Sequence, residues 1–535
     1  MRHWVLASLL CFFPAVPAFA QGRAAGQGSG QSTQQKTEQQ ADEEIRRSLE
    51  KITRVYHEVA TQLADPVDPE QAVYAGAIRG ALANLDPFSV FLDPGQFLSF
   101  QRQQRGVTQG FGAILSLQAG EVTVLQATPD APFARAGLGP GDRLIRINGH
   151  RVASMDLREL VDVLQAARSG RVRLSVIRSS QVVPEDFDLD PTEVPTETVD
   201  KKFWIEPGIG YMHVAHIEQA TPGEMQAVLE EWAPQNLRAL LLDLRGNPGG
   251  SLEAAIDIAG LFLPKDSLIT SVYGRALPKQ EYRVRQDPIA PSLPVVVILD
   301  RRTASAAEII AAALQEHDRA WLVGEASFGK GVVENVMPLT ESTALVLTVA
   351  RYLTPSGRSV QRPLPGTALA GILSGTERAF TTGRGRPLAE LGGVEPDQKA
   401  ESWQLDPWAR FLEESTAVIN FAQRYLERRG RISDDFAVSD SLIEDFHRYL
   451  EDSGVMIPAS WEDLVPFFKA RIQTELFNLV FGISRGNEVE VKADPQVQAA
   501  WQAVGQAREL LAAEPVAGLL ERPKPQQVSG SCCAQ

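Results

Sequence analysis

The sequence is poor in cysteine, histidine and positive charge. Its 535 residues include three cysteines and seven histidines, and 52 Lys plus Arg stand against 67 Asp plus Glu, giving a net charge of −15. Cys11 lies near the start, and Cys532 and Cys533 lie in the last four residues. A disulfide framework inside the fold and a cysteine-held zinc site are therefore excluded. Because nucleic-acid binding depends on clustered positive charge, we expect no nucleic-acid partner.

Several catalytic and nucleotide-binding motifs are also missing. The chain has no H-E-x-x-H metal motif, no G-x-G-x-x-G and no Walker lysine after its glycine-rich turn. What is present is 44% apolar and 22% charged residues, as in globular proteins. At roughly 150 residues per domain, the length predicts three or four domains.

The first twenty residues resemble a secretory signal. Arg2 and His3 give a basic start, residues 4–13 are mainly apolar, and Ala18-Phe19-Ala20 forms an A-x-A site. We expect cleavage after Ala20 and export to the periplasm or another compartment outside the cytoplasm. The alternative is an uncleaved membrane anchor, although the apolar run has about half of the ~20 residues that a spanning helix needs.

Composition and hydrophobic periodicity indicate a multidomain α/β protein. After the signal we expect a disordered spacer (residues 21–42), a helical region (43–104) and a glycine-rich domain of short strands (105–185). An α/β core (186–402), a helical C-terminal extension (403–520) and a loose tail (521–535) follow.

The α/β core and the extension have recognisable elements. Buried strands are predicted at Ala239–Leu244, Pro294–Leu299, Trp321–Val323 and Ala344–Val349, and helices at Leu252–Phe262 and Ala304–Glu316. In the extension, apolar spacing predicts one helix that begins after Asp406-Pro407, with Phe411 on its apolar face, and ends at Gly430. This extension could pack on the core or form an oligomer interface.

The glycine-rich domain resembles a PDZ domain. The loop GFGA (residues 110–113) precedes a short strand, and PDAPFARAGLGPGDRLIRING (129–149) and a helical segment (157–167) follow. In such a loop, backbone N–H groups converge on a peptide's terminal carboxylate while the strand edge pairs with the peptide. The resemblance therefore assigns peptide binding to Gly110, Phe111, Gly112 and Ala113. A PDZ-like fold that acts only as an internal spacer is the alternative.

Three segments of the core carry candidate chemistry. DLRGNPGG (243–250) is a strand-to-helix turn whose bare N–H groups suit an oxyanion. TASAAEI (303–309) places Ser305 among small residues at a helix start, where a serine is usually only a cap. GEASFGKG (324–331) places Lys330 in an apolar stretch. Burial favours the neutral amine, which can take the proton of a serine.

Together these segments resemble the carboxy-terminal processing (tail-specific) peptidases. LDPFSVFL (85–92), YLTPSGRSVQ (352–361) and GGVEPD (392–397) extend the match over roughly residues 45–400. The resemblance implies a crotonase-like ββα core without metal or cofactor, and a serine endopeptidase that cuts proteins near their C-termini; the signal segment adds the expectation of export. It assigns the nucleophile to Ser305, the general base to Lys330, and the oxyanion donors to the N–H of Ala306 and to that of Gly249 or Gly250.

One position departs from the family pattern. The family places a glutamine four residues after the lysine, where it orients the amine; here that residue is Glu334. An ionised carboxylate beside Lys330 would favour the ammonium form, which cannot act as a base. Either Glu334 is protonated, or it points elsewhere, or the enzyme works best at higher pH. Our hypothesis is an active enzyme with a raised pH optimum.

Other readings stay open. A Ser-His-Asp hydrolase would draw on His213 or His216, but at i and i+3 on one strand these side chains point to opposite faces. A non-catalytic PDZ scaffold that holds the tails of exported proteins would explain Glu334. The expected partners are proteins with accessible C-terminal tails, with a homo-oligomer and an adaptor protein left open.

Overall fold

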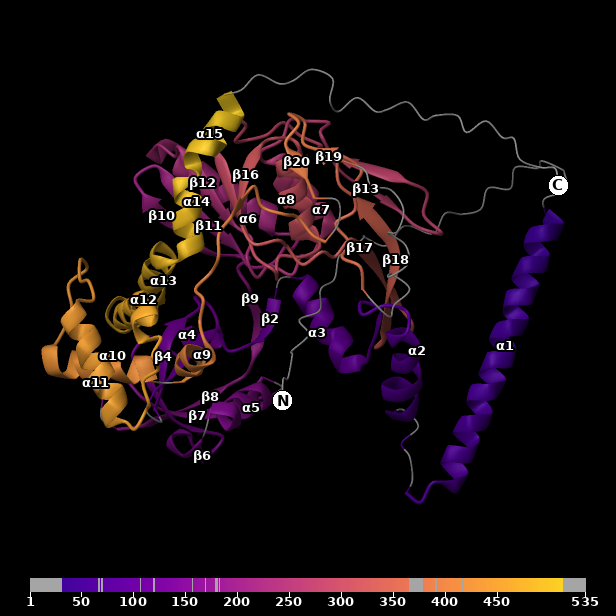
Figure 1. Ribbon diagram of the computed structural model, residues 1–535. Coiled ribbons are helices and arrows are strands. Elements are labelled where there is room, and N and C mark those ends of the chain that lie inside the picture. The colour runs from indigo at the N-terminus through magenta and orange to yellow at the C-terminus, as the bar shows by residue number, and fades with distance from the viewer. Residues whose placement is uncertain are drawn as a thin grey trace.

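The computed structural model describes residues 31–512, apart from residues 66–67, 69–70, 106, 119–120, 156, 169, 179–180, 182, 365–378, 390–391 and 416. The predicted signal, the loose tail and all three cysteines lie outside the described residues. In the described part of the chain, we find no helix with the length and hydropathy needed to span a bilayer. Figure 1 shows N-terminal helices, a small sheet domain, a larger core and C-terminal helices.

The N-terminal part is mainly helical. Its elements are α1 (Gln31–Gln62), the π-helix η1 (Gln71–Ile78), α2 (Arg79–Ala83), β1 (Val90–Leu92) and α3 (Pro94–Gln104). Because α1 begins at Gln31, the prediction of disorder over residues 21–42 is wrong from residue 31 onward. A segment poor in apolar residues cannot form a core, but its Gln, Lys, Glu and Ala residues favour helix. Helix α1 stands apart from the other elements (Figure 1).

The small sheet domain has the predicted order of elements. These are β3 (Ala113–Gln118), β4 (Glu121–Ala127), α4 (Pro132–Arg135), β5 (Arg143–Ile147), β6 (His150–Arg151), η2 (Val152–Ser154), α5 (Leu157–Ala167), β7 (Val172–Ile177) and β8 (Glu185–Leu189). The sheet order is β3-β4-β5-β7-β8, which leaves β3 at an edge, and β6 pairs with β5. Asn148 and Gly149 both have positive φ between β5 and β6, as a tight hairpin turn requires.

A separate two-stranded ribbon joins this domain to the core. Strand β2 (Val107–Gly110) pairs antiparallel with β9 (Thr192–Pro195), so that Gly110 lies opposite Thr192. Along the chain, β9 follows β8 of the small sheet and precedes β10 of the core.

A six-stranded sheet forms the centre of the core. Its order is β10 (Val199–Glu206), β11 (Ile209–Val214), β12 (Ala239–Asp243), β15 (Val295–Leu299), β16 (Ala320–Gly324) and β21 (Gln398–Lys399). Only the β10–β11 pairing is antiparallel. Three of the predicted strands are confirmed here, and most of their ends lie one residue away from the predicted position.

Helices cover both faces of this sheet, and the two-residue alternation of the strands decides which side chains each meets. Leu240 and Val297 pack with α6 (Thr221–Trp232), α7 (Leu252–Gly260) and α8 (Ala306–Glu316), while Leu241 packs on the opposite face. The 3-10 turn η3 (Ala233–Gln235) follows α6. Both predicted helices are confirmed, each two residues shorter than expected.

A second sheet closes over α7 and α8. It holds β1, β18 (Ala344–Leu353), β13 (Leu268–Tyr273) and β14 (Gln280–Arg283), with β17 (Val332–Pro338) also paired to β18. The predicted strand at Ala344–Val349 is confirmed and runs on to Leu353. Because β1 pairs with β18, the LDPFSVFL segment joins the core. The short strands β19 (Phe380–Thr381) and β20 (Pro387–Leu388) pair with each other.

The C-terminal extension is helical, but not as one long first helix. Its helices are α9 (Pro407–Glu414), α10 (Ala417–Arg429), α11 (Asp440–Asp452), α12 (Trp461–Phe481), α13 (Ile483–Ala493), α14 (Pro495–Gln502) and α15 (Val504–Ala512). The single helix predicted up to Gly430 is wrong, because Ser415 adopts an extended backbone. Phe411 is 64% exposed, so it does not belong to the buried face.

The extension divides its packing between two places. Helices α9 to α12 build a core of their own, rich in aromatic contacts such as the stacked Trp461 and Phe468. Helices α14 and α15 instead cover the second face of the six-stranded sheet, where Val497 and Val504 join the cluster of Leu241. Part of the extension therefore packs on the core, which settles one of the two roles that the sequence left open.

Candidate active site

Ser305 lies between β15 and α8 with no exposed surface. Its backbone has φ 58° and ψ −119°, a strained conformation for a residue with a side chain, whereas ordinary helix caps are extended. Such strain is concentrated at functional sites, so the interpretation of Ser305 as a simple cap loses its support.

The carboxylate of Glu308 joins the two candidate catalytic segments. Its Oε2 accepts hydrogen bonds from the backbone N–H of Ser305 and of Lys330, both at 2.8 Å. Its Oε1 accepts from Ser327 Oγ at 2.5 Å and from Gly329 N at 2.8 Å. Burial raises the pKa of Glu308 to about 7, although the four hydrogen bonds oppose the rise. One buried side chain thus holds the backbone nitrogens of Ser305 and Lys330 within two hydrogen-bond lengths of each other.

Sequence reasoning did not single out Glu308. The signal was present, since Glu308 stands three residues after Ser305, the spacing of a capping box. Tyr352 begins the family motif at 352–361, but sequence reasoning gave it no role. Its hydroxyl lies 2.8 Å from the carbonyl oxygen of Lys330 and 3.3 Å from that of Ser305, which makes a second bridge between the two segments.

Lys330 is fully buried, as its apolar neighbours predicted. Its Nζ lies 2.6 Å from Glu334 Oε1, and Glu334 is also fully buried. The same Nζ lies 4.8 Å from the ring centroid of Phe88. Of the three explanations for Glu334, the one in which it points elsewhere is therefore wrong. The amine of Lys330 therefore faces both a carboxyl group and an aromatic ring.

The segment LDPFSVFL supplies Phe88 through a buried turn. Asp86 Oδ1 accepts from the backbone N–H of Phe88 and of Ser89, both at 2.8 Å, and from Thr348 Oγ1 of β18 at 3.1 Å. Asp86 thus fixes this turn on the core sheet, beside the strand that follows Lys330.

Two other family motifs support the lysine segment. Gln361 Oε1 accepts from Gly331 N at 2.9 Å, and the backbone N–H of Ser327 donates to Val394 O at 3.0 Å. The segments 352–361 and 392–397 therefore form hydrogen bonds with the chain after and before Lys330, respectively.

The glycine-rich turn lies against the serine. A Cβ placed on Gly249 would fall 2.7 Å from Ser305 Cβ and 3.0 Å from Ala306 N, so only glycine fits. The N–H of Gly249, however, donates to Asn247 Oδ1 at 2.8 Å. Of the two predicted glycines, Gly250 is therefore the better candidate for the oxyanion donor. Ala306 is the first residue of α8, so its N–H has no partner within the helix.

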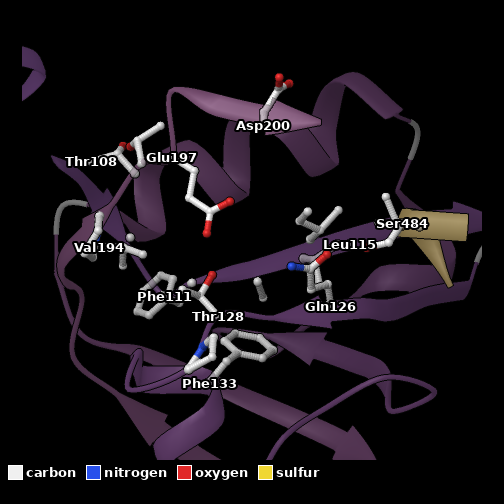
Figure 2. A pocket seen from close by; sticks show the side chains of 18 of the residues that line it. Thr108, Phe111, Leu115, Gln126, Thr128, Phe133, Val194, Glu197, Asp200 and Ser484 are labelled. Carbon is white, nitrogen blue, oxygen red and sulfur yellow. The ribbon is translucent and has the colours of Figure 1, made fainter. Parts of the chain in front are cut away.

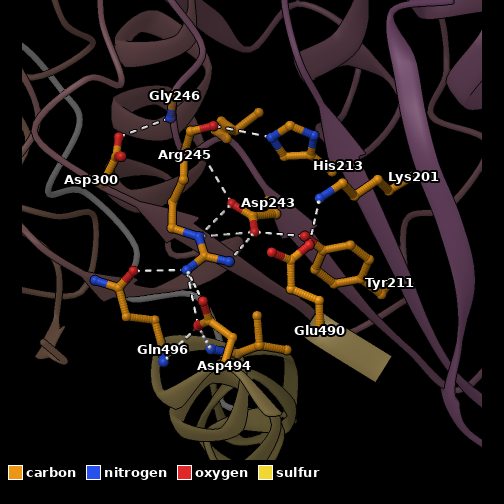
Figure 3. Close-up of polar contacts among 12 residues, drawn as sticks. Lys201, Tyr211, His213, Asp243, Arg245, Gly246, Asp300, Glu490, Asp494 and Gln496 are labelled. Atoms are coloured by element: carbon orange, nitrogen blue, oxygen red, sulfur yellow. Dashed lines mark hydrogen bonds and ion pairs between the residues drawn. The ribbon is translucent and has the colours of Figure 1, made fainter. Parts of the chain in front are cut away.

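Arg245, in the same turn, lies at the centre of a partly buried polar network (Figure 3). Its Nη2 is 2.6 Å from Asp243 Oδ2, and its Nη1 lies 2.9 Å from both carboxylate oxygens of Asp494 and 2.8 Å from Gln496 Oε1. Burial alone would raise the pKa of Asp243, but the charge of Arg245 holds it below its ordinary value. Sequence reasoning missed this link because Asp494 and Gln496 belong to the distant C-terminal extension.

Both ring nitrogens of His213, one of the two candidates for a hydrolase triad, contact groups other than Ser305. His213 Nδ1 lies 2.5 Å from Asp200 Oδ1, and its Nε2 lies 3.1 Å from Arg245 O. Burial lowers the pKa of His213, but its hydrogen bond to Asp200 and nearby carboxylates outweigh this and raise it overall. His216 follows β11 and is not part of it, so the prediction of two strand residues is wrong for His216. In the described part of the chain, no group of His, Cys, Asp and Glu could hold a metal ion.

The predicted peptide-binding loop lines a cavity of about 1110 Å³ (Figure 2). Gly110, Phe111, Gly112 and Ala113 all contribute to its wall. The remaining wall comes from β3, the interior of the small domain, the segment 194–203 and the junction of α12 and α13.

Comparison with known proteins agrees with this arrangement. The sequence profile described as "Peptidase family S41" matches residues 208–368, a "PDZ domain" profile matches 123–178, and "Activating protease CtpB N-terminal domain" matches 14–95. The "Carboxy-terminal-processing protease" of Bartonella bacilliformis is 30% identical over 319 residues, which cover 59% of this chain and 73% of that protein. The chain belongs to peptidase family S41.

Other relatives have similar descriptions. "Carboxy-terminal processing protease CtpA" of Bacillus subtilis is 30% identical over 58% of this chain and 66% of that protein. A solved structure titled "Photosystem II D1 C-terminal processing protease" is 25% identical over 69% of this chain and 90% of that one, with a TM-score of 0.36. The family profiles and the curated relatives identify the protein as a serine peptidase of the carboxy-terminal processing type with a PDZ domain, as its motifs predicted.

Proposed function

We propose that this S41 peptidase is an exported endopeptidase that cuts proteins near their C-termini through an acyl-enzyme on Ser305, with Lys330 as the general base. The observation that carries the proposal is the buried Glu308 carboxylate, which accepts from the backbone N–H of both residues. A dyad needs its two side chains at a fixed separation, and this shared acceptor fixes the backbones from which they extend.

In the proposed reaction, the neutral amine of Lys330 takes the proton of Ser305 Oγ as the oxygen attacks the scissile carbonyl. The carbonyl oxygen becomes an oxyanion, stabilised by the N–H groups of Ala306 and Gly250. When the tetrahedral intermediate collapses, the C–N bond breaks and Lys330 gives its proton to the leaving amine. A water molecule, deprotonated by the side-chain amine of Lys330, then hydrolyses the ester and restores the hydroxyl of Ser305.

The carboxylate of Glu334 sets the pH at which this reaction runs. At 2.6 Å from Lys330 Nζ, an ionised carboxylate stabilises the ammonium form, so the neutral base becomes available only at higher pH. We therefore keep the hypothesis of an active enzyme with a raised pH optimum.

Substrate tails bind the PDZ domain in this proposal. The carbonyl oxygens of Phe111 and Gly112 accept from Phe133 N and Thr128 N, so in these trans peptides the following N–H groups point the other way. They are thus available to a terminal carboxylate, and the adjacent strand β3 offers a free edge. Apolar side chains line the space behind it, including Leu164 and Ala167 of α5, which suits an apolar terminal residue.

One assay tests the proposal. The purified chain is incubated with an unstructured protein beside Ser305→Ala and Lys330→Ala, and products are followed by mass spectrometry at several pH values. Cleavage by the parent protein alone supports the dyad. Tail binding with no cleavage at any pH would favour the non-catalytic scaffold, for which the Glu334 departure is the specific support.

Export is tested separately. We propose that the signal segment is removed after Ala20, which the A-x-A site supports. N-terminal sequencing of the protein from the native cell should begin at Gln21. An intact N-terminus on membrane-bound protein would instead indicate the uncleaved anchor.

A further inference from the structure

We propose that Glu197 selects among substrate tails by favouring a basic side chain at the penultimate position. The inference rests on the proposed function, since it takes the PDZ cavity as the site where a tail binds. It adds a specificity residue from outside the PDZ sheet.

Strand geometry fixes which way each tail residue points. A carboxylate held at the loop that precedes β3 makes the tail run antiparallel to β3. Successive side chains of an extended peptide point to opposite faces. When the terminal side chain enters the apolar interior beside Leu164 and Ala167, the penultimate side chain points away from it, toward the segment 194–203 on the other wall.

That wall is firmly held on both sides of Glu197. Before it, β9 pairs with β2, and Val194 is 5% exposed. After it, the backbone N–H groups of Thr198 and Val199 both donate to Glu224 Oε2 at 3.0 Å. Glu197 itself is exposed, and Figure 2 shows its carboxylate directed into the cavity, toward the side where Phe111 and Thr128 lie. Because the backbone on both sides of Glu197 is held in place, its carboxylate can bind a cation with little loss of conformational entropy.

The other acidic residues of the lining are already engaged. Asp200 contacts His213, and Glu488 lies between Arg485 and Lys492. Among the residues that the structure describes, Glu197 forms no such ion pair, so its charge is left to act on a ligand.

Two cations of the lining, Arg168 and Lys202, likewise form no ion pair within the described ranges. They place positive charge along the same cavity, so the preference for a basic residue is confined to the tail position nearest Glu197.

The experiment measures peptide binding to the full chain carrying Ser305→Ala, which prevents cleavage. Two fluorescent peptides differ only in their ends, one Lys-Val and the other Glu-Val, and each is also made with an amidated C-terminus. By fluorescence anisotropy, we expect the Lys-Val peptide to bind about fivefold more tightly at low salt, as one partly exposed charge pair allows. The ratio should shrink as salt screens the pair.

Variants at Glu197 decide the matter. Glu197→Gln should bring the two affinities together, and Glu197→Lys should reverse their order, while the exposed Glu230→Gln on α6 should leave the preference intact. Equal affinities in the parent, or a preference that survives in Glu197→Gln, would overturn the inference while leaving tail binding in place. Equal binding of free and amidated peptides would overturn tail recognition itself, and the inference with it.

Discussion

Lys330 Nζ lies 2.6 Å from Glu334 Oε1, and neither side chain has exposed surface. Because both side chains are buried, opposite charges on the two groups would stabilise each other. In the family pattern, the residue four positions after the lysine is a glutamine. Glu334 occupies that position here, so an acid replaces a neutral amide. Its consequence should appear in the pH dependence of peptide cleavage.

Glu334→Gln should move the rising limb of the activity profile to lower pH. Without the carboxylate, the amine of Lys330 loses its charged partner, so our hypothesis predicts that the neutral base is available at lower pH. The measurement is kcat/KM across roughly pH 6 to 10. The exposed Glu341→Gln serves as the control, and identical profiles for the parent and Glu334→Gln would remove the hypothesis.

Glu308→Gln should weaken both stability and activity. The amide nitrogen of Gln would face backbone donors that now meet an oxygen, leaving buried N–H groups unpaired at a cost of about 2 kcal/mol or more. Urea unfolding and kcat report the two effects. Glu253→Gln, in the first turn of α7, is the matched control. A Glu308→Gln protein as stable and active as the parent would contradict the bridging role.

The same residue predicts a pH dependence of stability. The pKa of Glu308 is raised from 4.5 to about 7, so the folded state binds this proton more tightly than the unfolded state. Its contribution to stability is therefore full below pH 4.5 and is lost as the pH rises toward 7. Between these values, the free energy of unfolding should fall more steeply with pH in the parent than in Glu308→Gln. Parallel curves would argue against a raised pKa.

Asp494 offers a test of the link between the C-terminal extension and the glycine-rich turn. Its carboxylate both binds Arg245 and caps α14 by accepting from Gln496 N and Val497 N. Asn also caps helices, so Asp494→Asn should lose only the ion pair, about 1 kcal/mol, whereas Asp494→Ala should lose about 2 kcal/mol. Both should lower kcat, because Arg245 would lose a partner that holds the turn. Unchanged kcat would mean that the extension does not support catalysis.

Gly250→Ala should abolish most of the activity. Its φ is 143°, and an added Cβ would lie 1.9 Å from Ile217 O, so the turn must move and its N–H with it. Loss of one oxyanion donor costs a factor of about 10²–10³ in rate. Gly223→Ala is the control, because nothing lies within 4 Å of a Cβ there and Ala favours the helix α6. Comparable kcat values for the two variants would exclude Gly250 from the oxyanion hole.

Local patterns explain what could be read ahead of the structure. The strands and helices of the core could be assigned from sequence because their runs are strongly apolar. Glycines in the loop, the turn and the hairpin predicted where the backbone turns sharply. The patterns failed where a segment is amphipathic without a clear break, as at Ser415, or where low hydrophobicity was taken for disorder, as at Gln31. In both places backbone preferences, and not apolar content, decided the outcome.

By itself the sequence determined the family, the α/β core, the PDZ domain and the pairing of Ser305 with Lys330 as candidates, because these are carried by short motifs with fixed chemistry. Only the tertiary structure decided that Glu334 faces Lys330, that Glu308 joins two loops, and that Asp494 reaches Arg245 from 249 residues away. The physical reason is that the partner of a buried or partly buried charge depends on which distant elements pack beside it. The spacing of residues along the chain does not show which elements these are.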